Sequence, residues 1–178
     1  MKYIFFCSVF VLSSAHAHLM PRNHGTLNVT NGKAYIVLAL PISVFSTGEA
    51  KAVVADGVLT PTDLKTDSKR LKAAIRKGIV LTHQAQAVHI SSILLNLPKG
   101  PHHTPERSTE VTAMIVAPLK NSKGALGPID MTMSLWGKDT KTFKLKTTVT
   151  QSGRTVRSAI VEFTPRASHH RVVDSSTP

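Results

Sequence analysis

Cysteine is almost absent from this sequence: Cys7 is the only one among 178 residues. It lies in an apolar N-terminal stretch that we expect to be removed on export, so the mature protein has no thiol. Disulfide bridges, thiol catalysis, iron–sulfur clusters and zinc–thiolate sites are therefore excluded for the mature chain. About 160 residues remain, which is the size of one domain that can bury a core of its own.

Aromatic residues are also few, and they rarely lie among the basic ones. The chain has 22 Lys and Arg against 10 acidic residues, a net charge of +12, but only one Trp, two Tyr and six Phe. Much of the positive charge lies in Lys65–Lys77 and Lys138–Lys146, which contain little aromatic sequence, whereas single-stranded nucleic acid is bound by aromatics stacked in a basic groove. We expect no nucleic-acid partner; the charge fits an anionic envelope surface or solubility alone.

Motifs of the common enzyme classes are missing as well. The sequence has no G-x-S-x-G, Walker or Rossmann pattern, and its acidic residues form no recognisable catalytic pair. We therefore predict a protein that is not an enzyme.

The first 17 residues have the composition of a secretion signal. Lys2 precedes the apolar run Tyr3–Leu12, and Ala15-His16-Ala17 is a cleavage site of the A-x-A type. A transmembrane helix is the alternative, but the run is well short of the roughly 20 residues that cross a bilayer. We predict export to the periplasm or the exterior, with no transmembrane span in the mature chain.

Cleavage after Ala17 makes His18 the first residue of the mature protein, whereas cleavage after Ala15 leaves two more residues in front of it. The segment from His18 through Met20 to His24 then supplies an α-amino group, two imidazoles and a thioether within seven residues. Neutral imidazole suits copper and zinc, and thioether favours reduced copper. This segment is the first candidate metal site; the alternative is that these are exposed terminal residues with no fixed site.

Six more histidines follow, but their positions do not predict a preformed cage. His83 and His89 are six residues apart and share a face on an unbroken strand, unless Gln84–Ala87 holds a turn. We keep both as candidate copper or zinc ligands. The others form two adjacent pairs whose side chains rarely converge: His102, His103, His169 and His170.

The rest of the sequence predicts a mainly β fold. Asn31-Gly32 between runs of β-forming residues predicts a tight hairpin, and later segments alternate apolar and polar residues as half-buried strands do. Thr60 and Pro61 predict the start of an amphipathic helix over about residues 61–77. The predicted fold class is an antiparallel immunoglobulin-like β-sandwich with this one helix inserted.

We divide the chain into three parts. Residues 1–17 are the signal peptide and residues 18–164 a single sandwich domain. Residues 165–178 lack the alternation of the preceding strands, so we expect a poorly ordered C-terminal tail.

The segment before the helix resembles the second half of an EF-hand calcium loop. Aligning Gly57 with the invariant loop glycine puts four residues at ligand positions: Asp56, Val58, Thr60 and Asp63. The first half does not fit, because Ala52 and Val54 stand where carboxylates are needed. We expect a degenerate loop with weak or absent calcium binding; the alternative is an ordinary Asp-Gly turn before an ordinary helix start.

With these features the chain resembles a group of small exported bacterial proteins. They have a His-rich mature N-terminus, a Gly-Thr-Leu-Asn stretch and an EF-hand-like Asp-Gly loop before a helix. The matching residues here are His18-Leu19-Met20, Gly25-Thr26-Leu27-Asn28 and Asp56-Gly57. The resemblance covers roughly the first half of the chain, and it implies a periplasmic or secreted location but no established reaction.

Three functional hypotheses follow. The first is an exported, non-enzymatic metal-binding or accessory protein that takes copper or zinc at His18 and His24, with a metal ion or an envelope protein as its partner. The second is an EF-hand-like calcium-binding module or its structural relic. The third is a copper-dependent oxidative enzyme, which needs a further histidine such as His83 or His89 to approach His18. The sequence leaves the metal and the oligomeric state open.

Overall fold

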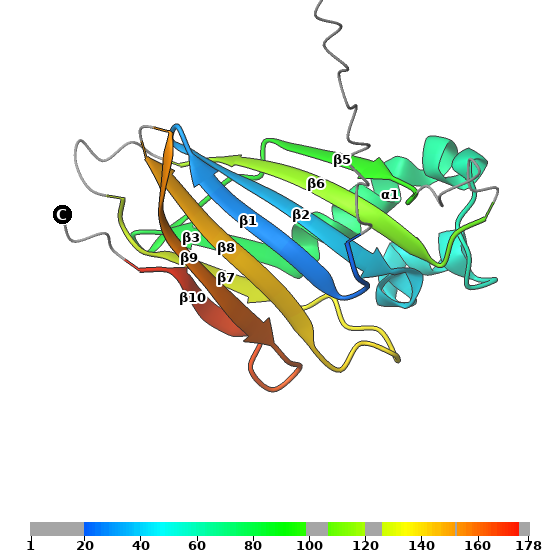
Figure 1. The fold of residues 1–178 in the computed structure, drawn as a ribbon. Helices are drawn as coiled ribbons and strands as arrows, with labels where there is room; N and C mark the ends of the chain where they lie inside the picture. The colour runs from blue at the N-terminus through cyan, green and yellow to red at the C-terminus, as the bar shows by residue number, and fades with distance from the viewer. Residues whose placement is uncertain (1–19, 99–106, 120–125, 152, 175–178) are drawn as a thin grey trace, which may run out of the picture.

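The protein is seen here as a computed structural model that describes residues 20–98, 107–119, 126–151 and 153–174. The predicted signal peptide and His18 lie outside these residues. In the described part of the chain, two β-sheets pack against each other, and one α-helix and two 3-10 helices lie beside them (Figure 1). The predicted mainly β sandwich with one helix is confirmed.

Ten strands of the described residues form two sheets. The larger sheet has the order β5-β6-β2-β1-β8-β9; its strands are β1 (His24–Thr30), β2 (Lys33–Pro41), β5 (Ser92–Asn96), β6 (Glu110–Pro118), β8 (Phe143–Gln151) and β9 (Arg154–Phe163). The smaller sheet has the order β10-β7-β3-β4; its strands are β3 (Ile79–His83), β4 (Gln86–Ala87), β7 (Ile129–Met133) and β10 (His169–Val173). Between β2 and β3 the chain forms η1 (Ile42–Phe45), η2 (Gly48–Val54) and α1 (Pro61–Gly78).

The first hairpin forms where the sequence predicts it. Asn31 has φ 49° and Gly32 has φ 67°, the left-handed values that a two-residue type I′ turn requires at both central positions. The turn joins Thr30 to Lys33 and sets the antiparallel register of β1 and β2. Since β2 lies in the middle of the larger sheet, this local signal places one of its central strands.

One strand pair departs from the antiparallel prediction. β1 lies parallel to β8, with Leu27 opposite Thr147 and Val29 opposite Val149. The two strands are more than a hundred residues apart, and apolar alternation carries no information about strand direction. The pairing is therefore a long-range feature that the pattern could not predict.

The core fills the space between the sheets. Three phenylalanines are its largest fully buried side chains: Phe45, Phe143 and Phe163. Alternate residues of β2 and β6 point into it, which is why these strands read as alternating or continuously apolar sequence. At roughly 25 cal/mol for each Å² of apolar surface removed from water, this burial is the main stabilising term.

The helix α1 covers part of the core with one face. Leu71 and Ile75 are fully buried, while Leu64 and Ala74 are partly buried and pack against the core, as their helical spacing predicts. The Thr60 hydroxyl accepts a hydrogen bond from the Asp63 amide at 3.1 Å and starts the helix. No helix in the described residues has the length and apolar composition needed to cross a bilayer.

The expectation of a poorly ordered tail from residue 165 is wrong for its central part. Residues His169–Val173 form β10, which pairs antiparallel with β7. Val172 and Val173 are buried, and the His170 ring meets Phe163 edge-on at a centroid distance of 4.9 Å. This strand has too few apolar residues to show alternation, so its order depends on pairing with β7 rather than on a local signal.

Candidate functional site

The chain makes a tight turn directly before β1. The His24 amide donates a hydrogen bond to the Pro21 carbonyl at 3.2 Å, and Asn23 between them has φ 60°. Asparagine tolerates this left-handed conformation better than most residues because its short side chain can bond locally. The Asn23 amide also bonds to the Ala39 carbonyl at 3.1 Å, so the turn is fixed to the end of β2.

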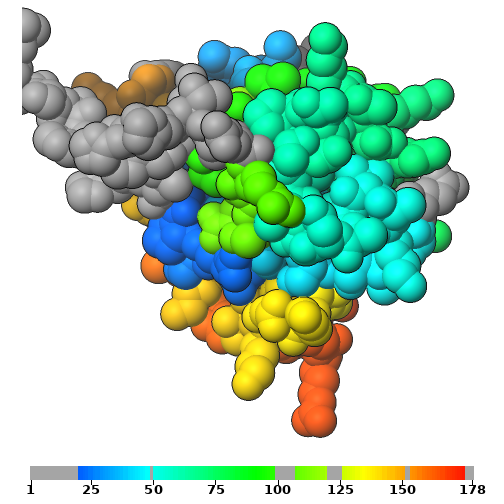
Figure 2. Space-filling view, turned by 90° about the vertical axis from the view of Figure 1, so that its right-hand side faces the viewer, coloured from blue at the N-terminus to red at the C-terminus, as the bar shows by residue number. Residues whose placement is uncertain are grey.

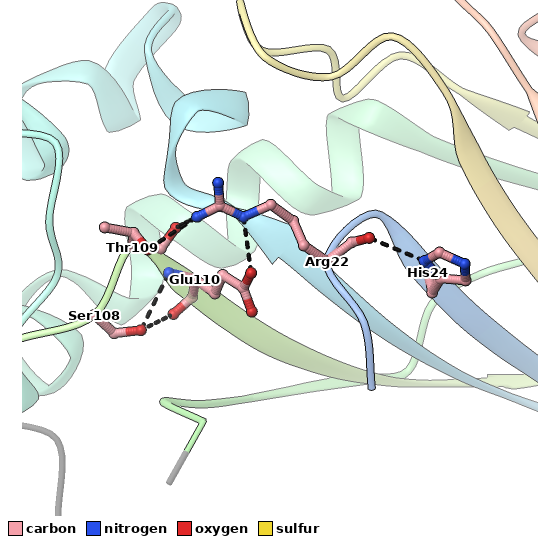
Figure 3. A network of polar contacts seen from close by, with 5 residues as sticks. All are labelled: Arg22, His24, Ser108, Thr109 and Glu110. Atoms are coloured by element: carbon pink, nitrogen blue, oxygen red, sulfur yellow. Dashed lines mark hydrogen bonds and ion pairs between the residues drawn. The ribbon is translucent and has the colours of Figure 1, made fainter. Parts of the chain in front are cut away.

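The His24 ring has one nitrogen occupied. Its Nδ1 lies 2.9 Å from the backbone carbonyl oxygen of Arg22 (Figure 3). A carbonyl oxygen can only accept, so Nδ1 carries the proton and Nε2 of the neutral ring has a free lone pair. The side chain is partly exposed. A histidine whose second nitrogen bonds to a backbone carbonyl is the usual form of a metal-bound imidazole.

Arg22, which carries that carbonyl, is itself held by β6. Its Nε donates to Glu110 Oε1 at 2.8 Å, and its Nη2 donates to Thr109 Oγ1 at 2.9 Å. The Ser108 hydroxyl in turn accepts from the Glu110 amide at 3.1 Å and donates to the Glu110 carbonyl at 2.8 Å (Figure 3). This polar network ties the segment before β1 to the start of β6, and it limits the freedom of the Arg22 carbonyl.

The sequence did not identify Arg22 or Glu110 as part of this site. They are 88 positions apart, and an isolated Arg and an isolated Glu carry no signal that they will meet. Met20, a predicted ligand, is partly exposed just before the turn. His18, the other predicted ligand of the segment, lies outside the described residues.

The remaining predicted histidine ligands do not lie near this turn. β3 starts at the end of the sandwich where His24 lies. Gly78, which precedes β3, lines a surface hollow together with Val44 of η1, and η1 directly follows the end of β2 that pairs with His24. β3 then runs toward the other end of the sandwich (Figure 1). His83, its last residue, is therefore at the opposite end from His24.

His83 is a buried core histidine, whereas His89 is exposed. A turn at Gln84 and Ala85, with φ 52° and 60°, ends β3 and breaks the shared face that an unbroken strand would give the two histidines. His83 is 4% exposed, and its Nε2 has no hydrogen-bond partner in the described structure. Burial lowers the pKa of His83 below its ordinary value of 6.5, because the charged ring cannot be hydrated there.

Within the described residues, no three His, Asp, Glu or Cys side chains come together as a metal cluster. A metal site built only from these residues is therefore not present as a preformed cage. His24 supplies one oriented nitrogen, and a metal site at this turn needs further ligands, for which Met20 and His18 are the predicted candidates of the segment.

The carboxylate of Asp63 is used within the calcium-like loop. Its Oδ2 accepts hydrogen bonds from the Thr60 amide at 2.8 Å and the Thr60 hydroxyl at 2.7 Å. These two bonds, the hydroxyl first, lower the pKa of Asp63 from its ordinary value of 3.8. The carboxylate completes a capping box instead of reaching a metal.

Asp56 and Val58 are also engaged locally. Asp56 Oδ1 accepts from the Val58 amide at 3.3 Å, and its Oδ2 forms an ion pair with Arg107 at 2.9 Å. Next to Arg107, Ser108 exchanges two backbone hydrogen bonds of 2.8 Å with Leu59. A guanidinium from a distant part of the sequence thus neutralises the carboxylate at the EF-hand ligand position. This pairing could not be predicted from the sequence, because Asp56 and Arg107 are far apart along the chain.

Comparison with protein-family models and with curated proteins finds no match to this sequence.

Proposed function

We propose that the mature protein is an exported, non-enzymatic metal-binding or accessory protein that takes copper or zinc at its N-terminal segment, through His18 and His24. The observation that carries this proposal is the hydrogen bond between His24 Nδ1 and the Arg22 carbonyl. It leaves Nε2 as the coordinating nitrogen and fixes the plane of the ring, so less freedom is lost on binding a metal.

The turn before β1 also supports the proposal, because it brings the chain back toward His24 only three residues after His18. A turn closed by a hydrogen bond between its first and fourth residues keeps their Cα atoms within about 7 Å, so Pro21 lies near His24. His18 precedes Pro21 by three residues, a span of at most about 11 Å when extended. The α-amino group and ring of a mature His18 are therefore within reach of the His24 ring.

The test is a copper titration of the protein processed to begin at His18, with affinity measured by competition against a chelator and the copper environment by electron paramagnetic resonance. Adding one alanine before His18 removes the amine–imidazole chelate, and we expect at least a tenfold loss of Cu²⁺ affinity. His24→Ala removes the anchored imidazole and has an effect of the same order. His89→Ala, which changes an exposed histidine elsewhere, is the matched control and leaves the affinity unchanged.

Equal affinity and identical spectra for all four proteins would overturn the proposal. The proposal would also be overturned if only His89→Ala weakened binding, because the metal would then be held away from the N-terminal segment. Zinc is tested in the same series by competition with a zinc-responsive dye, since both metals take neutral imidazole.

A further inference from the structure

A hollow of about 500 Å³ lies between α1, η2 and the residues that follow β7. This volume falls within the range of sites that bind small molecules. Figure 2 shows α1 (teal), η2 (cyan) and the segment after β7 (yellow) gathered on the same face of the molecule. The hollow shares no residue with the turn that holds His24.

Apolar and small side chains make up much of its lining. Val44, Ala50 and Leu135, which are almost fully buried, line it together with Ala73 and Ala74 of α1. Because the two alanines present only a methyl group each, the helix leaves space there instead of filling it. An aliphatic group that covers this surface removes it from water, which contributes a favourable free energy of roughly 25 cal/mol for each Å² covered.

Two cations flank this apolar surface. Arg70 and Lys77 are the charged residues that line the hollow, and seven positions on a helix put them on the same side, about 10 Å apart along its axis. Arg70 Nη1 pairs with Asp67 at 3.1 Å, which leaves the other guanidinium nitrogens for a second anion. None of the ion pairs among the described residues involves Lys77.

The surroundings of the hollow are also positive. The exposed face of α1 carries further basic residues, and the two aspartates of the helix are engaged, Asp63 in the cap and Asp67 with Arg70. The basic residues are Lys65, Lys69 and Arg76, which are exposed, and Lys72, which is partly exposed. A potential of one sign around a site attracts ligands of the opposite charge and speeds their association.

We propose that this hollow binds a single-chain aliphatic carboxylate, whose chain lies over Ala73, Ala74 and Leu135 and whose head pairs with a cation at the edge of that apolar surface, Arg70 or Lys77. A wholly polar anion would leave the apolar lining uncovered, and a neutral apolar molecule would bury the cations without a partner. A carboxylate matches the fork of Arg70 and the ammonium of Lys77.

The probe is decanoate, and the reporter is Trp136, the only tryptophan of the chain. Trp136 follows Leu135 directly and is partly buried against the core, so filling the hollow should change its fluorescence. We expect saturable binding of decanoate below its micelle concentration. Decanol, which has the same chain without the charge, should bind at least tenfold more weakly, and decyl phosphate should bind no more tightly than decanoate.

Two double variants distinguish binding by the two cations of the hollow from attraction by the net positive charge of the helix. Arg70→Glu with Lys77→Glu reverses both cations of the hollow and should weaken decanoate binding at least tenfold. Lys65→Glu with Lys69→Glu makes the same change of net charge on exposed positions of the same helix, outside the hollow, and should change binding less than threefold. Equal effects of the two pairs would overturn the proposal.

A filling variant tests the place of the chain. Ala73 is exposed on α1, so Ala73→Leu should fold with an unchanged Tm, and its side chain should occupy the hollow and abolish decanoate binding. Binding of decanoate to Ala73→Leu as tightly as to the parent would overturn the proposal. So would the absence of saturable binding to the parent protein, or tighter binding of decanol or decyl phosphate than of decanoate.

Discussion

Two segments of this protein carry side chains of metal-ligand type, and the structure treats them differently. In the turn before β1, a hydrogen bond to one nitrogen of His24 leaves the other nitrogen available. In the loop before α1, both oxygens of Asp56 and the Oδ2 of Asp63 are already bonded to the protein itself. Ligand type at the right spacing is therefore not sufficient for a metal site, because a metal needs lone pairs that the fold has left unused.

The two segments are also held by different forces. The loop is anchored by Leu59, which is fully buried, and by two backbone hydrogen bonds to Ser108. The turn also has backbone hydrogen bonds, from Asn23 to Ala39 and from Lys144 to Asn23, but it has no fully buried side chain. The polar network that supports it joins Arg22 and Glu110, which are 42% and 21% exposed. Changes in the loop should therefore act mainly on stability, and changes in the turn mainly on the orientation of His24.

Truncation of the loop anchor should have the largest effect on stability. Leu59→Ala removes a buried side chain and leaves a cavity, so we expect the free energy of unfolding to fall by about 2–5 kcal/mol. Urea denaturation followed by Trp136 fluorescence measures it. The folded variant should bind copper with the same affinity as the parent protein. A tenfold loss of affinity in this variant would show that the two segments are coupled.

Loss of the Arg22 side chain should have the next largest effect, and on affinity rather than stability. Arg22→Ala leaves the backbone carbonyl and the Asn23–Ala39 hydrogen bond of the same peptide in place, but it removes the support from Glu110 and Thr109, so the His24 ring should be held less firmly. Outer-shell changes of this kind cost about tenfold in metal affinity, or about 1.4 kcal/mol. Chelator competition with Cu²⁺ measures the change.

The matched control for Arg22→Ala is Arg107→Ala. Both variants remove a partly exposed arginine that pairs with a carboxylate, but Arg107 holds the loop and not the turn. If both variants lowered copper affinity equally, the effect would come from lost positive charge and not from the orientation of His24.

Removal of the helix cap should cost about 1 kcal/mol. In Thr60→Ala the Asp63 amide loses its acceptor and the Asp63 carboxylate loses a hydroxyl donor, and loss of an N-cap hydroxyl has typically this effect. Thr62→Ala, on the exposed first turn of the same helix, is the control and should change stability by less than half as much. Equal destabilisation by both variants would argue against the capping box as the cause.

The pKa of Asp63 gives this cap a pH dependence. Its pKa is below 3.8 in the folded protein because Thr60 bonds to the charged form, so the cap stabilises the fold fully at pH values above 3.8. The part of the stabilisation that depends on the charged carboxylate is lost as the pH falls through the lowered pKa of Asp63. The stability difference between the parent and Thr60→Ala should therefore shrink toward pH 2, as measured by urea denaturation at several pH values; a constant difference would contradict it.

The sequence allowed local features of the fold to be predicted, but not the features that depend on partners far along the chain. The hairpin at Asn31-Gly32 and the start of α1 at Thr60 depend on conformational preferences of a few adjacent residues, and both were predicted correctly. The parallel pairing of β1 with β8 and the strand β10 depend on partners far along the chain. The same holds for the site: the residue type of His24 is visible in the sequence, but its Arg22–Glu110 support is not.

The smallest effect is expected from freeing the carboxylate of Asp56. Arg107→Ala removes an ion pair whose side chains are both about 60% exposed, so stability should change by less than about 1 kcal/mol.

If the loop were a calcium site blocked only by this guanidinium, millimolar Ca²⁺ would raise the Tm of the variant but not of the parent, because a ligand of the native state stabilises it. We expect no such rise, since Asp63 remains bonded to Thr60 and Val54 offers a core side chain where a ligand is needed. A calcium-dependent rise in Tm confined to Arg107→Ala would reverse this conclusion and make the loop a latent cation site.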